Sequence, residues 1–191
     1  IIYEFTTHGR HFRGIMWTNI LVNLSALIFF SFVGHFESSD QNSILTDSAG
    51  IMTLASTLTV SVAAIYGVVI LNRLLLKDYI GNAREIIFLF PGGRFEIFLS
   101  KVISLSIHCF FSLVPVLLLE NLIFYFVGLS LGVLSTGLFV YGLKAIFVAM
   151  FAGFFVLIVV LTSILVGQVT QSINVPIIVS IIIVSIMGNF V

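Results

Sequence analysis

The sequence predicts an all-α membrane protein with several membrane-spanning helices. Apolar residues make up 60% of the 191 residues, charged residues make up 8%, and the mean hydropathy is +1.24. A soluble domain carries about 25% charged residues. The chain therefore has too few polar residues to coat a soluble core. Its long uncharged runs, separated by short polar segments, indicate that lipid surrounds much of it.

The first part of the chain contains two predicted spans, residues 14–34 and 49–71. Each apolar run has about 20 residues or more, which at about 1.5 Å per residue crosses a hydrocarbon core of about 30 Å. Residues 1–13 precede the first span and mix Tyr, Phe and Arg with polar residues. This composition predicts a short amphipathic helix at the membrane interface.

The distribution of positive charge predicts the orientation. Five of the eight Lys and Arg residues lie in 73–101, and Arg10 and Arg13 precede the first span. The loop 35–47 has acidic residues and no Lys or Arg. Cytoplasmic loops are the ones enriched in Lys and Arg. We therefore expect a multi-pass protein of the cell membrane with its N-terminus and residues 73–101 in the cytoplasm.

The second part of the chain allows two topologies. Either the chain turns at Glu120-Asn121, or one long helix continues past these residues. Residues 128–137 contain three glycines together with Ser and Thr, which is the stronger turn signal. We therefore expect the turn there, between two long helices at 102–127 and 138–166.

A fifth span is predicted at residues 175–191. Residues 167–174 form a short cytoplasmic turn before it, Asn174 caps the helix, and Pro176 lies in its first turn, where no amide partner is missed. The chain opens on Ile1 and ends inside an apolar run, so we expect both ends to continue beyond the given sequence.

Glu120 and Lys144 are charged residues within the predicted spans. With the turn centred near Gly132, each lies twelve residues from it (132 − 120 and 144 − 132), at similar depth. A charge inside the membrane costs about 2.5–3.5 kcal/mol on insertion scales, and such residues usually pair or face a cavity. One interpretation is a Glu120–Lys144 pair near the outer leaflet. The other is that both side chains snorkel to the headgroups.

Hydroxyl groups line one face of the second span. Thr53, Ser56 or Thr57, and Ser61 recur at spacings of three to four residues. These side chains can bond to the carbonyls of their own helix. Alternatively, the face lines a dimer interface or a substrate path.

The charged segment 73–101 has the pattern of an amphipathic helix followed by a sharp turn. Pro91 ends the helix because it lacks an amide donor, and a second short helix begins at Arg94. The segment could simply connect two spans along the interface. It could also insert Phe88 and Leu89, which lie off the main apolar stripe, into a partner's groove.

The run REIIFLFPGGRFEIFLSK, residues 84–101, resembles the signature of type-two ABC transporter permeases. In that family a Glu and an aromatic pair precede a Pro and then an Arg, and a short helix ends in Lys where the third span begins. The matching residues are Glu85, Phe88, Phe90, Pro91, Arg94 and Lys101. The order of spans and loops is also similar. Gly92-Gly93 departs from the family, which more often has an apolar residue or Ser after the proline.

This resemblance implies an ABC exporter transmembrane domain, with five spans visible and a sixth missing. It also implies a coupling helix that binds a separate ATP-binding cassette ATPase subunit. The residues implied in that contact are Arg84, Glu85, Phe88, Leu89, Phe90, Pro91 and Arg94. A second permease, identical or different, would complete a dimer. Small bacterial relatives commonly export, or confer immunity to, antimicrobial and other amphipathic peptides, so a peptide substrate is the corresponding expectation.

We expect the chain to be a transport subunit without enzymatic activity of its own. It lacks a G-x-x-x-x-G-K-[ST] loop, so ATP and Mg would be bound by the partner ATPase and no cofactor by this chain. The histidines lack co-ligands for a metal, and the zero net charge offers no basic face for nucleic acid. The alternative is an ATP-independent secondary carrier or channel, which would place ionisable residues near the membrane midplane.

Overall fold

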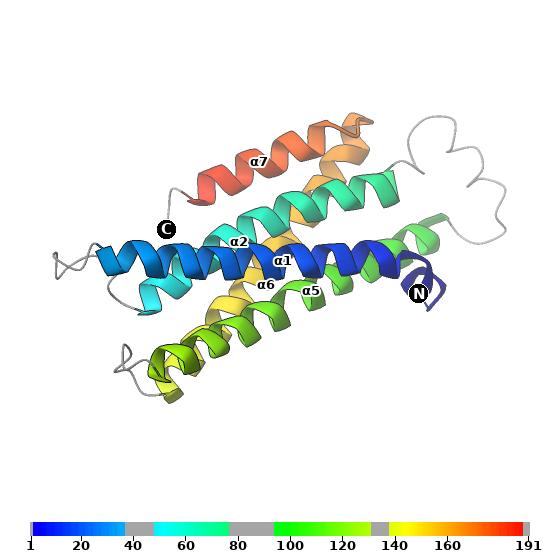
Figure 1. The fold of residues 1–191 in the computed structure, drawn as a ribbon. Coiled ribbons are helices and arrows are strands. Elements are labelled where there is room, and N and C mark those ends of the chain that lie inside the picture. Colours follow the sequence, from blue (N-terminus) through cyan, green and yellow to red (C-terminus); the bar gives the residue numbers. More distant parts are fainter. Residues whose placement is uncertain (1, 37–47, 77–93, 131–137, 189–191) are drawn as a thin grey trace.

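A computed structural model describes the chain except for residues 1, 37–47, 77–93, 131–137 and 189–191. Every regular element in this described part is helical, as the sequence predicts (Figure 1). The elements are α1 (Ile2–Phe36), α2 (Ser48–Leu71), the π-helical turn η2 (Asn72–Leu76), α5 (Arg94–Ser130), α6 (Leu138–Thr170) and α7 (Val175–Gly188).

Four of these helices are long and apolar enough to cross a membrane. The candidate spans are Arg13–Phe36, Ala49–Leu71, Phe98–Ser130 and Tyr141–Thr170. They indicate a membrane protein. The predicted fifth span is described only as α7, whose 14 residues reach about 21 Å at about 1.5 Å per residue. This is less than the hydrocarbon core of about 30 Å.

The helix boundaries decide between the two predicted topologies. α5 continues without interruption through Glu120 and Asn121 to Ser130, and α6 begins at Leu138. A turn at Glu120-Asn121 is therefore excluded; of the predicted turn 128–137, residues 128–130 belong to α5 and 131–137 lie outside the described residues. α5 also begins earlier than predicted, at Arg94, because the short helix before the third span and the span itself form one helix.

Two other boundaries differ from the prediction. Residues 2–13, predicted as a separate interfacial helix, are continuous with the first span in α1. α6 extends to Thr170, so the turn before α7 is shorter than the predicted 167–174. The helix ends where Gln171 adopts a left-handed backbone with φ of 52°. The backbone carbonyl of Asn174 then accepts from the amides of Ile177 and Ile178, which starts α7 at the predicted position.

The four long helices form a bundle in which each packs against two neighbours. α1 lies against α2 and α5, and α6 lies against the same two helices from the other side; α7 covers α2 and α6. Small residues bring α5 and α6 close together. A Cβ atom added at Gly153 would lie 2.5 Å from Val114 Cγ2 and 2.7 Å from Phe110 Cε2, which is too close for undisturbed packing.

The distribution of polarity in the bundle is the reverse of that in a soluble protein. Large apolar side chains face outward, including Phe147 at 73% exposure and Phe151 at 70%, whereas Asn23 and Asn121 are fully buried. Exposed aromatic residues of this size are stable against lipid and unfavourable in water. Polar groups inside such a bundle bond across helices because lipid supplies no partners.

Candidate functional site

Five polar side chains meet where α1, α2 and α5 pack together. We call Asn23, Ser56, Thr59, Glu120 and Asn121 the polar cluster. Three helices supply these side chains. Asn23 comes from α1, Ser56 and Thr59 lie about one turn apart on α2, and Glu120 and Asn121 are consecutive on α5. Consecutive helical residues diverge, so Glu120 faces α1 while its neighbour faces α2.

Hydrogen bonds connect the polar cluster across all three helices. Asn23 Nδ2 donates to Glu120 Oε2 at 2.7 Å. Thr59 Oγ1 lies 3.1 Å from Asn23 Oδ1 and 2.8 Å from the Ala55 carbonyl of its own helix, and its single proton is donated to one of these oxygens at a time. Asn121 Nδ2 donates to Ser56 Oγ at 3.3 Å. The contacts therefore run from Glu120 through α1 to α2 and return from α2 to the residue beside Glu120.

The polar cluster is buried but incompletely paired. Glu120 is 6% exposed, and Asn23, Thr59 and Asn121 are fully buried. Glu120 Oε1 and Asn121 Oδ1 have no hydrogen-bond partner within the described part of the chain. One turn below Asn23 on α1, Asn19 donates to the Ser112 carbonyl at 3.3 Å, while its own Oδ1 is also without a partner. A buried polar atom without a partner costs about 1–3 kcal/mol, and more if it is charged.

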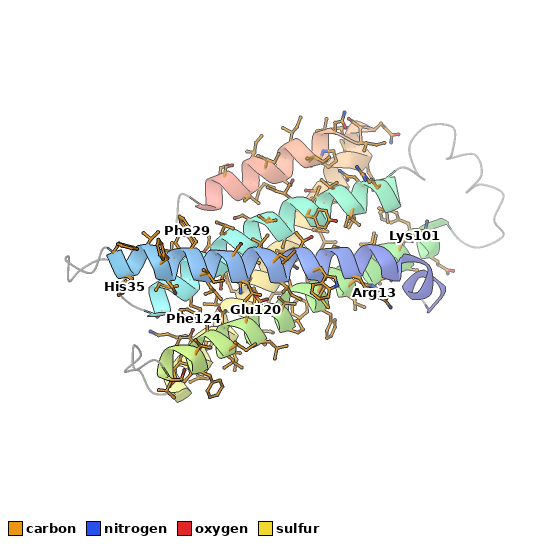
Figure 2. All side chains as sticks on the ribbon, viewed as in Figure 1. Arg13, Phe29, His35, Lys101, Glu120 and Phe124 are labelled. Carbon is orange, nitrogen blue, oxygen red and sulfur yellow. The ribbon has the colours of Figure 1, made fainter. Side chains whose placement is uncertain are left out.

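The polar cluster lies near the middle of the bundle along the helix axes. Asn23 is close to the midpoint of the span Arg13–Phe36, and Thr59 is close to the midpoint of Ala49–Leu71. Figure 2 shows Glu120 between Arg13 and His35, which lie toward opposite ends of α1. Within its own span, Phe98–Ser130, Glu120 lies ten residues from the end (130 − 120).

The structure does not form the predicted pair between Glu120 and Lys144. Glu120 Oε2 accepts from Asn23 and Oε1 is unpartnered, while the Lys144 side chain is exposed. The two residues lie on different faces of their helices, which is the reason that they do not meet. Exposure of Lys144 agrees with the snorkelling interpretation for that residue, whereas Glu120 is buried against α1.

A groove adjoins the polar cluster on the other side of α2. Its volume is about 430 Å³, and α2, α6 and α7 all contribute to its walls. The lining residues are Thr53, Ser56, Thr57, Val60, Ser61, Phe147, Val148, Phe151, Ala152, Phe155 and Val184. The predicted hydroxyl face of the second span thus faces this groove. Thr59 instead points into the polar cluster.

The hydroxyl groups of this face bond within α2, as the first interpretation expects, and the face also lines the groove. Thr53 donates to the Ala49 carbonyl, Thr57 to the Thr53 carbonyl at 2.7 Å, and Ser61 to the Thr57 carbonyl at 2.9 Å. The hydroxyl protons are therefore used within α2, as expected of Ser and Thr in helices. The oxygen lone pairs remain available toward the groove. Ser56 both lines the groove and contacts Asn121, so it connects the groove with the polar cluster.

Most of the predicted coupling residues lie outside the described part of the chain. These are Arg84, Glu85, Phe88, Leu89, Phe90 and Pro91; Arg94 is described as the first residue of α5. Arg13 and Lys101 lie toward the same end of the bundle in Figure 2, and His35 lies at the other. This arrangement matches the charge asymmetry on which the predicted orientation rests.

The described residues contain no group of three His, Cys, Asp or Glu side chains that could hold a metal. His108 Nδ1 lies 2.7 Å from the Ser104 carbonyl of its own helix, and Cys109 is a buried free thiol. Sequence reasoning missed the asparagines of the site. The signal was the spacing of Asn19 and Asn23, four residues apart on one helical face within an apolar span.

Comparison with protein-family models found no match, and comparisons with curated proteins and with solved structures found none either.

Proposed function

We propose that this chain is the permease subunit of an ATP-driven ABC exporter. In this proposal, a separate ATP-binding cassette ATPase binds ATP and Mg and contacts residues 84–94, and a second permease completes the transporter. The family resemblance of residues 84–101 motivates the proposal. The observation that carries it structurally is the continuity of α5, which begins at Arg94 inside that motif and runs unbroken to Ser130.

Because α5 is one continuous helix, it could transmit motion from the ATPase contact into the bundle. A helix of 37 residues is about 55 Å long at about 1.5 Å per residue. A displacement at its cytoplasmic start would be transmitted to Glu120 and Asn121 along one continuous helix, in which Pro115 removes one backbone hydrogen bond before these residues. Movement of Asn121 acts on Ser56, which lines the groove. This gives a physical route from the ATPase contact to a substrate path between α2, α6 and α7.

A second contact supports the same mechanism. The buried Asn72, the first residue of η2, donates from Nδ2 to the Ile173 carbonyl at 3.1 Å. Ile173 lies in the turn between α6 and α7. The start of the segment 73–101 is thereby tied to the turn before α7, so motion of this segment would also reach α6 and α7.

The groove fits an amphipathic substrate. Aromatic side chains from α6 and hydroxyl-bearing side chains from α2 line it, so an apolar chain and a hydrogen-bond donor can be accommodated together. An exported amphipathic peptide, or a peptide to which the transporter confers immunity, is the substrate class that we propose.

Reconstitution with the ATPase tests the proposal. The chain should co-purify with a soluble ATPase whose hydrolysis is stimulated by substrate. Glu85→Ala and Phe88→Ala should abolish this stimulation without affecting membrane insertion, whereas Glu37→Ala, in the acidic loop predicted on the opposite side, should not. Normal stimulation in both coupling variants would remove the proposed contact.

The depth of the polar cluster favours a second candidate, an ATP-independent carrier or channel. Such proteins place ionisable residues near the middle of the membrane. Glu120 bonds to Asn23, which is close to the midpoint of the span Arg13–Phe36. Substrate movement by the purified chain in vesicles without ATP or ATPase would favour this candidate. Movement that requires both would favour the exporter.

A further inference from the structure

The polar cluster presents an excess of buried oxygen acceptors. Among the described residues, Glu120 Oε1 and Asn121 Oδ1 lack partners, and the one donor that reaches the carboxylate is Asn23 Nδ2 at 2.7 Å. Thr59 Oγ1 and Ser56 Oγ keep acceptor lone pairs at the same junction. The site therefore needs a group that is positive and contacts several oxygens at once.

Described cationic side chains do not fill this role. Arg13, Arg73 and Lys144 are exposed. Lys101 lies nineteen residues before Glu120 (120 − 101), about 28 Å along α5 at about 1.5 Å per residue. A charge at this depth is normally paired, so the carboxylate needs a counter-ion from elsewhere.

We propose that the polar cluster binds a monovalent alkali-metal cation, Na⁺ or K⁺, for which the unpartnered Glu120 Oε1 and Asn121 Oδ1 are oxygen ligands. Oxygen ligands from carboxylates, amide carbonyls and hydroxyls are those preferred by hard cations. A single carboxylate matches one positive charge, whereas calcium sites usually gather several carboxylates. Protonation of Glu120 is the alternative, since its O–H could donate to Asn121 Oδ1; that alternative predicts no dependence of stability on Na⁺ or K⁺.

The inference rests on the polar cluster alone and is independent of the proposed exporter function. Binding would stabilise the packing of α1, α2 and α5, since the ligands come from α5 and their hydrogen-bond partners come from α1 and α2. Because Asn121 also contacts Ser56 on the groove wall, cation binding would influence the shape of the groove.

Thermal unfolding of the full chain in lipid nanodiscs tests the site. Stability is compared in NaCl, KCl and choline chloride at equal ionic strength, without ATP or an ATPase. A ligand that binds only the folded state raises the unfolding temperature. We expect Na⁺, K⁺ or both to stabilise the wild-type chain relative to choline, and the difference between the two salts identifies the preferred cation.

Variants assign the effect to the polar cluster. Glu120→Gln and Asn121→Ala should weaken cation affinity by about tenfold or more, as loss of a ligand does at metal sites. Glu96→Gln makes the same change at an exposed position of α5 and should retain the full cation dependence. Direct binding of radioactive ²²Na⁺ and its competition by K⁺ provide a readout on wild-type protein, even if a variant fails to fold.

Two results would overturn the proposal. One is equal stability of the wild-type chain in all three salts, with no saturable ²²Na⁺ or K⁺-competed binding. The other is cation stabilisation that persists unchanged in folded Glu120→Gln, which would move the ion to another place. Either result would leave the polar cluster as a purely structural contact between helices.

Discussion

Tyr125 and Tyr141 stack with ring centroids 4.6 Å apart and an angle of 33° between their planes, joining the end of α5 to the start of α6. The two helices are antiparallel, so this contact defines their register. Glu120, five residues before Tyr125, lies level with about the fifth residue after Tyr141. Lys144 is therefore at a similar depth, as the predicted turn required. The charges still do not meet, because Glu120 faces α1 and Lys144 faces outward.

Charge reversal tests this separation. Glu120→Lys should destabilise the chain, and adding Lys144→Glu should not rescue it, because residues without a shared partner couple by about 0.3–0.5 kcal/mol at most. A cycle combining Asn23→Ala with Glu120→Gln should show larger coupling, about 0.5–3 kcal/mol, because these side chains are hydrogen-bonded. Unfolding in detergent provides the measurement. Rescue by Lys144→Glu would contradict the structure.

Gly153 is predicted to be intolerant of a side chain. Gly153→Ala would place a methyl group against Val114 and Phe110, at 2.5 Å and 2.7 Å, and should destabilise the chain by about 1–3 kcal/mol. Gly142→Ala, in the same helix, is the matched control because a Cβ there meets nothing within 4 Å. Thermal unfolding of the two variants side by side checks the prediction. Equal unfolding temperatures would mean that α5 and α6 are less closely packed than described.

The bond from Asn72 should control the turn between α6 and α7. Asn72→Ala leaves the Ile173 carbonyl without its donor, at a cost of about 1 kcal/mol. Amides near residues 171–174 should then exchange with deuterium roughly fivefold faster if they open locally. Arg73→Ala, at the exposed next residue, should leave exchange in the turn unchanged. Unaltered exchange in Asn72→Ala would show that this bond does not hold the turn.

Gln171 should accept glycine and reject a β-branched residue. Its φ of 52° lies in the left-handed region, which costs a residue with a Cβ about 1–2 kcal/mol and costs glycine little. Gln171→Gly should therefore maintain or raise stability, while Gln171→Val should lower it. The ranking by unfolding temperature is the test. A Val variant as stable as the Gly variant would argue for a right-handed backbone at this position.

Much of the fold could be predicted from composition and local turn signals. The all-α class and the separation of α5 from α6 followed from long apolar runs and from the glycines of 128–137, because these features act over a few residues. The predicted helix boundaries were less accurate. α5 begins at Arg94, earlier than the predicted residue 102. α6 continues to Thr170, and the left-handed backbone of Gln171 ends it.

The sequence by itself determined that this chain is helical and apolar enough to cross a membrane, with its cationic residues concentrated in few segments. Only the tertiary structure decided which polar residues meet. Asn23 and Glu120 are separated by 97 residues and have no local signal that pairs them. Their contact arises because α1 and α5 share a face in the bundle, and the direction of a side chain around its helix is decided by packing.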